Sequence, residues 1–369
     1  MNDIKTMVLG FCTPWIIYAA ITLLHIILPA RKVKGYIGHE KTGELLHYRL
    51  NGILVLPASI ILWFVLGYFR IVPHDWLYTV RWESLAGAVC MGLLYSFIIV
   101  LRAPSTGKFL CADFWFGRIK DPQFKNGLID AKMWLYLIGA VMLQLNILSF
   151  AAHHWKTFQA SGQVNPGYLL GTVMLTWFCW EYLFHERVHL YTYDFIAERV
   201  GFKLGFGCLS FYPFFYSISL WSTVNLPNPG HPLWLNVLFG VIFWGGWCLT
   251  RGANMQKFYF KIAPEKSFLG IQPEVLSDGK HNLLVNGFWG KSRHINYLGE
   301  IIQGCAVALA AGYAFSFPAV CFVWLYPLYY VALLFTRQVD DDKICKAKYG
   351  ELWDAYTIKV KYRIIPYIY

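Results

Sequence analysis

The sequence predicts an all-α integral membrane protein, a multi-pass bundle of about ten transmembrane helices. Apolar residues make up 57% of the 369 residues and charged residues only 14%, whereas charged residues are about 25% of an average soluble domain. Aromatic residues reach 18%, and several apolar runs approach the roughly 20 residues that cross a bilayer as a helix. A water-soluble surface cannot be built from so few charges, which excludes a soluble globular protein.

Candidate spans are distributed along the whole chain without an internal repeat or a low-complexity tract. We therefore expect nine or ten spans in a single membrane-embedded domain over residues 1–369. The first apolar run, Met7 to Leu28, is followed by no convincing cleavage site, so we expect it to remain as a span. The candidates centre on residues 8–29, 51–69, 84–101, 132–151, 167–184, 203–222, 233–250, 300–316 and 318–335.

Basic residues predict the orientation of the chain. The formal net charge is +11, and the Lys and Arg residues gather in 31–49, in 102–132, after 250 and in the tail, while 152–166 holds only Lys156. Because cytoplasmic loops carry an excess of Lys and Arg, we expect the four basic segments in the cytosol, beside anionic lipid headgroups. No long basic stripe lies on a soluble face, so a nucleic-acid partner is not expected.

Several familiar motifs are missing. The nine Cys form no CxxC pair, which argues against a disulfide framework or a structural zinc site. No Walker A loop occurs, and Gly201, Gly205 and Gly207 in "GFKLGFG" do not follow a strand pattern, so no Rossmann fingerprint is supported. Close helix packing or a hinge is the use we expect for these glycines.

One motif suggests a metal. His185, Glu186 and His189 form an H-E-x-x-H string, which on a helix places two imidazoles on one face for zinc, with the glutamate as general base. With Asp278 as a third ligand, this string would make an intramembrane zinc metalloprotease, which we keep as an alternative. The pair at 153–154 also resembles part of the histidine boxes of di-iron lipid enzymes, but such sites need more imidazoles at repeated spacing.

The last third of the chain mixes cationic and amide side chains with aromatic rings. The segments "RGANMQKFYFK", "GFWGKSRHINYLGE" and "TRQVDDDKICKAKYGELWDAY" are the clearest cases. Polar groups near a membrane are tolerated where they line a cavity or pair with each other. The segments form either a solvated cytoplasmic rim or, as we expect, a pocket for a large anionic ligand such as a nucleotide, with Arg and Lys on the phosphates.

These segments carry a resemblance to a known family. "LLVNGFWGKSRHINYLGE", followed by "DDDKICKAKYGELWDAY" and "YRIIPYIY", resembles the sterol reductases of the C14, C7 and C24 group, which include the sterol-reductase half of the lamin B receptor. Upstream, "HYRLNG", "ADFWFGR", "HERVHLYTYDF", "GFGCLSFYPFFYS" and "RGANMQK" follow in the family's order. The resemblance implies about ten helices and NADPH-dependent reduction of a carbon–carbon double bond in a sterol. The segments "RHINYLGE" and "IIPYIY" favour the C14 double bond slightly over C7 and C24.

The resemblance also implies where the cofactor binds. It puts N-terminal helices in 1–200, and the sterol pocket and the NADPH-binding half, open to the cytosol, in 201–369. The cations would select the 2′-phosphate, hence NADPH over NADH, and Trp289 or Tyr349 would stack on adenine or nicotinamide. The implied cofactor contacts are Asn254, Lys257, Lys261, Trp289, Arg293, His294, Asn296, Tyr297, Arg337, Asp341, Tyr349 and Tyr356.

The chemistry of the reaction predicts further roles. An isolated alkene is not electrophilic, so a proton must arrive before the hydride, and the site needs a protonated acid and electron-rich rings that tolerate a carbocation. Tyr216 matches a tyrosine of the family's sterol pocket and is the expected proton donor, although a packed membrane aromatic is the simpler reading. Glu186 and Asp194 are expected to supply that proton or tune its pKa, since they fall on the family's Asn-Glu pair and its acidic residue.

The chain departs from the family pattern at five positions. Cys208 stands where an Asp is usual and Ser219 where a Gln is common, both near the expected sterol pocket. Lys261 replaces a frequent Arg. In the cofactor half, Thr336 replaces a His and Asp340 an Arg, which removes positive charge. A sterol-binding scaffold without turnover is therefore a third possibility, but we expect catalysis.

The expected partners are a sterol, NADPH and membrane lipids, with no metal. The membrane would be the endoplasmic reticulum in a eukaryote and the inner membrane in a bacterium, with the cofactor side cytosolic. The sequence does not predict an oligomeric state.

Overall fold

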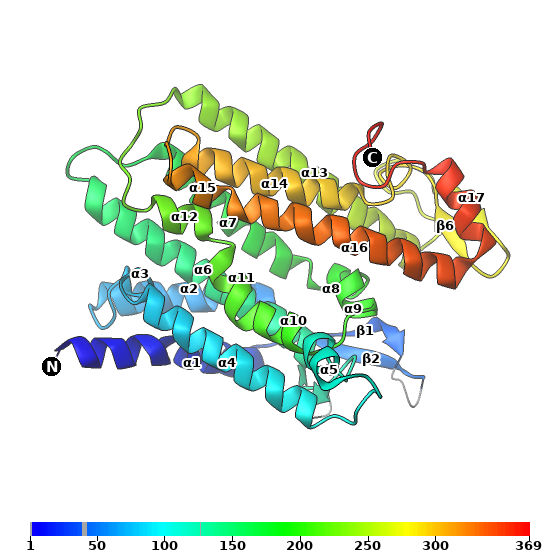
Figure 1. Ribbon diagram of the computed structural model, residues 1–369, viewed down its shortest axis with the longest axis horizontal. Helices are drawn as coiled ribbons and strands as arrows, with labels where there is room; N and C mark the ends of the chain where they lie inside the picture. The colour runs from blue at the N-terminus through cyan, green and yellow to red at the C-terminus, as the bar shows by residue number, and fades with distance from the viewer. Residues whose placement is uncertain (1, 39–42, 126) are drawn as a thin grey trace. The chain divides into compact units, whose positions relative to one another are not determined.

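A computed structural model describes residues 2–38, 43–125 and 127–369, and the chain divides into two compact units, Met1–Asn228 and Pro229–Tyr369. Figure 1 shows the helices and strands of each unit. The sequence predicted a single domain whose halves meet at residues 200–201. That prediction concerns the relation between the halves and stays a prediction, so each unit is described by itself.

The first unit is mainly helical and contains two small strand pairs. Its elements, in chain order, are α1 (Asn2–Ile27), β1 (Arg31–Gly38), β2 (Leu45–Leu50), α2 (Gly52–Tyr68), α3 (Trp76–Thr79), α4 (Arg81–Leu101), α5 (Leu110–Phe116), β3 (Gln123–Phe124), β4 (Ile129–Asp130), α6 (Ala131–Phe158), α7 (Pro166–Phe184), α8 (Glu186–His189), α9 (Tyr193–Ile196), α10 (Phe202–Phe206), the π-helical turn η1 (Gly207–Phe211), α11 (Tyr212–Phe215) and α12 (Ile218–Thr223).

Helix α6 forms the core of this unit. About 78% of its most apolar stretch is buried, against 28% for α1 and 39% for α4. Its first turn is fixed by Asp130, whose carboxylate accepts a hydrogen bond from the Met133 N–H at 3.0 Å. Helices α1 and α4 approach closely at Gly87, where an added Cβ would lie 2.0 Å from the Phe11 carbonyl oxygen. Small residues allow such contact between membrane helices.

The sequence predicted one continuous span over residues 203–222, and here the structure differs. The segment is divided into α10, η1, α11 and α12. Pro213 lies in the first turn of α11 and has no N–H to continue a preceding helix. The π-helical turn adds a residue to the backbone ladder directly before it, a feature frequent at functional sites. The apolar composition of the segment predicted burial correctly but not continuity.

The second unit contains three long helices and one strand pair. Its elements are α13 (Leu233–Ile262), β5 (Val275–Ser277), β6 (Asn282–Leu284), α14 (Ile295–Gly312), α15 (Ala319–Val323), α16 (Leu325–Tyr349) and α17 (Glu351–Lys359). Helix α14 packs against both α13 and α16, and the three run side by side in Figure 1. At the crossing of α13 and α14, a Cβ on Gly246 would lie 2.8 Å from the Gly299 carbonyl oxygen.

The structure confirms a mostly helical, multi-pass membrane protein. Among the described residues six helices are long and apolar enough to cross a membrane, and α2 is a shorter apolar helix. The expected number of about ten is not confirmed. Within the same residues three two-stranded antiparallel sheets also form, which the all-α prediction omitted. In β1 and β2 a buried Tyr48 packs over Gly35, so these polar segments gain a local core.

Candidate active site

In the second unit, α14 and α16 bring three of the predicted cofactor residues together. The Tyr297 hydroxyl donates a hydrogen bond to the Asp341 carboxylate at 3.0 Å. The His294 ring stacks on Tyr297 at 4.8 Å between centroids, and its Nδ1 lies 3.8 Å from the same carboxylate, beyond hydrogen-bond distance. Asp341 therefore organises a polar face whose members are far apart in the sequence.

His294 is neutral in this environment. Burial, with the positive charges of Lys257 and Arg293, lowers the pKa of His294 to about 3. Its Nε2 atom is buried and has no hydrogen-bond partner among the described residues. A neutral imidazole with one uncommitted nitrogen can donate to or accept from a polar ligand.

Two amide side chains extend this face. The Asn296 Nδ2 donates to the Asn254 Oδ1 at 3.3 Å, and the Thr250 hydroxyl fixes the backbone by donating to the Asn296 carbonyl at 2.9 Å. The Asn296 Oδ1 is buried and lacks a hydrogen-bond partner in the described part of the chain. Buried polar atoms are nearly always satisfied, so this acceptor fits a ligand that carries a hydroxyl or amide donor.

Cationic and aromatic side chains of α13 and the following loop lie beside one another. Lys257 holds its ammonium 5.3 Å above the Trp289 ring, and the Trp289 indole N–H donates to the Ala253 carbonyl at 2.8 Å. Lys261 lies one turn further along the same helix. Residues four apart on a helix share one face, so the two lysines make this face of α13 cationic.

Arg293 has an environment that the sequence did not predict. Its guanidinium lies 3.4 Å from Asp342, which also accepts a hydrogen bond from Gln338 at 2.6 Å and lies 3.7 Å from Arg363. The prediction named Asp341 and overlooked Asp342. Adjacent residues on a helix point about 100° apart. Only the fold shows that Asp341 contacts the Tyr297 hydroxyl while Asp342 contacts Arg293.

Two of the three predicted tyrosines of this unit, Tyr349 and Tyr356, belong to one aromatic row. Trp353 stacks on Tyr356 at 4.9 Å and lies near Tyr349 at 6.4 Å. Trp353 and Tyr356 are buried, so the row anchors α17 to the end of α16. Arg337 lies one turn before Asp341 on α16.

Two departures from the family pattern point away from this face. The Asp340 side chain is 62% exposed and lies 3.7 Å from Lys343. The Thr336 hydroxyl donates to backbone carbonyls of its own helix, Ala332 and Leu333. Neither residue therefore places a charge against Asp341 or His294.

In the first unit, Glu186 holds the start of α2. Its Oε2 accepts a hydrogen bond from the Gly52 N–H at 3.1 Å, and an added Cβ on Gly52 would lie 2.6 Å from Oε1. The side chain is buried, and this burial raises the pKa of Glu186 to about 8. A carboxyl that keeps its proton at neutral pH has the property required of a proton source.

Tyr216 and Asp194 lie in other surroundings of the same unit. The Tyr216 ring contacts Tyr212 edge-on at 4.6 Å and lies 6.2 Å from Phe178. Asp194, in α9, is close enough to Lys132 and to Cys208 for electrostatic interaction. Cys208 therefore lies near Asp194, while its place beside a sterol pocket stays a prediction.

Lys132 was not predicted as a site residue. It is buried and donates to the Phe195 carbonyl at 3.1 Å, with Asp121 at 3.0 Å. The signal was present in the sequence: a lysine directly inside an apolar helix is costly unless it is paired.

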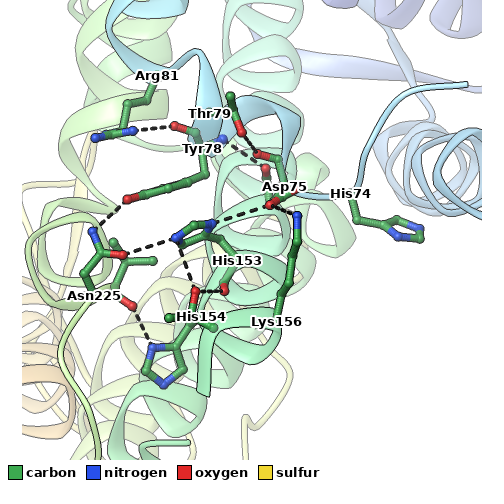
Figure 2. Close-up of polar contacts among 12 residues, drawn as sticks. His74, Asp75, Tyr78, Thr79, Arg81, His153, His154, Lys156 and Asn225 are labelled. Atoms are coloured by element: carbon green, nitrogen blue, oxygen red, sulfur yellow. Dashed lines mark hydrogen bonds and ion pairs between the residues drawn. The ribbon is translucent and has the colours of Figure 1, made fainter. Parts of the chain in front are cut away.

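The histidines behind the two metal hypotheses bond mainly to the backbone and to amides. His185 lies 2.9 Å from the Glu181 carbonyl oxygen and His189 3.1 Å from that of Tyr182. Figure 2 shows His153 between Asp75 and Asn225, and His154 on the Val224 carbonyl. No cluster of three or more metal-ligating side chains occurs in residues 2–38, 43–125 and 127–369.

Comparison with known proteins gives the family. The profile described as "Ergosterol biosynthesis ERG4/ERG24 family" matches residues 5–369. The chain belongs to this family. The match confirms the resemblance to the sterol reductases, and with it the class of enzyme, an oxidoreductase acting on CH–CH groups.

Individual family members cover nearly the whole chain. It is 31% identical to a Delta(14)-sterol reductase of Arabidopsis thaliana, covering 93% of this chain and 91% of the relative. It is 32% identical to a Delta(14)-sterol reductase of Mus musculus, with 97% and 86% covered. A probable 7-dehydrocholesterol reductase of Acanthamoeba polyphaga mimivirus is 26% identical, with 99% and 83% covered.

Proposed function

We propose that this protein uses NADPH to reduce the C14 double bond of a sterol. Two relatives named Delta(14)-sterol reductase, 31% and 32% identical to this chain, support C14 over C7. The relative named as a probable 7-dehydrocholesterol reductase is 26% identical. The observation that carries the cofactor proposal is the polar face of the second unit. There His294, beside the Asp341–Tyr297 pair, has an uncommitted nitrogen, and Asn296, paired with Asn254, has an uncommitted oxygen.

The residues of that face fit a phosphorylated dinucleotide. Lys257, Lys261 and Arg337 offer cations for its phosphates, and Asn296 accepts from a ribose hydroxyl or a carboxamide N–H. When bound, NADPH supplies the hydride. The neutral His294 would offer the cofactor a hydrogen bond without adding a positive charge.

The proton is proposed to come from the first unit. Tyr216 donates its hydroxyl proton to the alkene, which leaves a tertiary carbocation in the sterol, and the rings of Tyr212 and Phe178 stabilise positive charge nearby. Glu186, protonated at neutral pH, and Asp194 return a proton to Tyr216 directly or through water.

The deciding experiment is mass analysis of sterols after incubation of the purified protein with C14-, C7- and C24-unsaturated substrates and either NADPH or NADH. We expect a product two hydrogens heavier from the C14 substrate, formed much faster with NADPH. Binding of both ligands without any product would instead indicate a sterol-binding scaffold. One tightly held zinc per chain, with loss of activity on chelation, would revive the metalloprotease alternative.

A further inference from the structure

The second unit contains a cleft of about 730 Å³ whose lining is mostly cationic. Five of its ten lining residues are Arg293, Lys343, Lys346, Lys361 and Arg363, and only two carboxylates face them. The excess of three positive charges concentrates in one concave surface, where fields from several charges add.

The cleft is separate from the proposed cofactor face. On α16 the cofactor residues Arg337 and Asp341 lie one turn apart and share a side of the helix, whereas Lys343 is turned about 200° from Asp341. Of the predicted cofactor residues only Arg293 also lines the cleft. The two surfaces therefore lie on different sides of one helix.

Most charges inside the cleft are already paired with each other. Asp342 lies between Arg293 and Arg363, and Lys346 forms an ion pair with Asp354. Lys361 has neither a hydrogen bond nor an ion pair within the described residues. Both carboxylates of the cleft are engaged, so Lys361 remains to meet an anion from outside the protein. Lys343 can join it, because the ion pair of Lys343 with Asp340, at 3.7 Å, is exposed to solvent and therefore weak.

The residues of α16 that line the cleft belong to the charged half of this helix, which follows an apolar half. The helix is apolar up to Phe335 and charged from Arg337 onward. The Tyr369 ring stacks on Phe335 at 5.3 Å, and Arg363 donates to the Tyr369 hydroxyl at 3.1 Å. Lys343 is eight residues beyond Phe335, about 12 Å along the helix axis. The long side chain of Lys343 can bring its ammonium group closer to the apolar half of the helix than its Cα lies.

The C-terminal segment that follows Lys361 and Arg363 of the cleft exposes apolar side chains. Tyr367 is 78% exposed and Ile368 80% exposed, and tyrosine is typical of the membrane–water boundary. A soluble phosphate compound would gain nothing from these two residues. A lipid would cover them with its acyl chains while its headgroup met the lysines.

We propose that this cleft binds the phosphate headgroup of an anionic phospholipid from the cytoplasmic leaflet, with its acyl chains against Tyr367 and Ile368. Basic pockets at the cytoplasmic ends of membrane helices select such headgroups by charge. The site would tie α17 and the segment 361–369 to the membrane surface, independently of which substrate the enzyme reduces.

Native mass spectrometry of the full chain, released from bilayer discs of phosphatidylcholine with or without phosphatidylglycerol, tests this proposal. The double variant Lys343→Gln/Lys361→Gln should weaken retention of phosphatidylglycerol on the order of 20-fold, since each lysine contributes about a fivefold effect. The double variant Lys266→Gln/Lys280→Gln removes two equally exposed lysines outside the cleft. It should retain the lipid as the unmodified protein does.

Three results would overturn the proposal. An equal loss in both double variants would mean diffuse surface attraction and no site. Displacement of phosphatidylglycerol by saturating inorganic phosphate at constant ionic strength would assign the cleft to a soluble phosphate. If NADPH displaced the lipid, and the cleft variant lost NADPH while keeping phosphatidylglycerol, the cleft would belong to the nucleotide. Because lipid retention is measured without substrate, it is independent of the proposed reduction.

Discussion

Two buried groups of this protein have pKa values that differ strongly from those in water. His294 is neutral because burial and two nearby cations lower its pKa to about 3. Glu186 keeps its proton because burial raises its pKa to about 8, from an ordinary 4.5. One adjoins the proposed cofactor face, and the other lies in the unit that carries the proposed proton donor.

At the residue scale, Tyr216→Phe removes only the hydroxyl that we propose as the proton donor. We expect turnover to fall about 100-fold or more, the range for loss of a general acid, while NADPH binding measured by calorimetry stays unchanged. Tyr212→Phe is the matched control, because its ring contacts Tyr216 edge-on. Unchanged turnover in Tyr216→Phe, or an equal loss in Tyr212→Phe, would rule out Tyr216 as the donor.

Glu186 makes stability depend on pH. The folded protein holds this proton up to about pH 8, whereas the unfolded chain releases it near 4.5. The stabilisation is therefore complete below about pH 4.5 and is lost as the pH rises through 8. We expect the thermal unfolding midpoint in detergent to decrease as the pH is raised from about 5 to about 9. The loss of folding free energy should reach several kcal/mol, at about 1.4 kcal/mol per pKa unit.

The variant Glu186→Gln carries the control for that experiment. Glutamine keeps the size of the side chain and an oxygen that accepts from the Gly52 N–H, but it does not titrate. The midpoint should then vary much less over the same pH range. A slope identical to that of the unmodified protein would show that other groups cause the dependence.

At the scale of elements, the second unit depends on how closely α13 and α14 approach. A Cβ on Gly246 would lie 2.8 Å from the Gly299 carbonyl oxygen and 2.9 Å from Ile302, while a Cβ on the adjacent Gly245 would meet nothing within 4 Å. The two glycines are neighbours in sequence, yet only one lies in the interface. Such small residues let membrane helices pack through dispersion contacts.

We therefore expect Gly246→Ala to destabilise the protein by about 2 kcal/mol or more and Gly245→Ala to leave stability unchanged or slightly raised. Alanine at either position favours the helix, so a difference between them isolates the packing term. Thermal unfolding of the purified variants measures it. Equal midpoints for the two variants would contradict the close crossing of α13 and α14.

At the scale of the whole molecule, the distribution of basic residues predicts one orientation. Residues 31–49, 102–132 and the segment after 250 are expected in the cytosol, and the segment 152–166 is expected on the other side. An exposed cysteine is already present in the second of these basic segments, Cys111.

This orientation predicts labelling by a membrane-impermeant maleimide. In intact bacterial cells that carry the protein in the inner membrane, a Cys introduced by Ser161→Cys should react from outside, because Ser161 is exposed in the poorly basic loop. Cys111 should react only after the membrane is made permeable. Mass spectrometry of the labelled peptides distinguishes the two. Reaction of Cys111 in intact cells would reverse the orientation and move the cofactor side out of the cytosol.

Composition and local motifs were enough for the class of fold and for the family. A chain with so few charged residues cannot form a water-soluble surface. Strings such as "RHINYLGE" and "YRIIPYIY" occur where the family has them. They also located the residues that meet around Asp341, since His294, Tyr297 and Asp341 all belong to those strings.

Only the tertiary structure decided how neighbouring residues divide their roles. Asp341 accepts a hydrogen bond from Tyr297, while Asp342 lies against Arg293. Gly246 is packed against α14, while a Cβ on Gly245 would meet nothing within 4 Å. The apolar segment 203–222 contains a π-helical turn at 207–211 and a turn at 216–217. In each case the sequence shows the type and hydrophobicity of a residue but not its contacts. On a helix, a change of one position turns a side chain by about 100°. Which partner it then meets depends on distant parts of the chain.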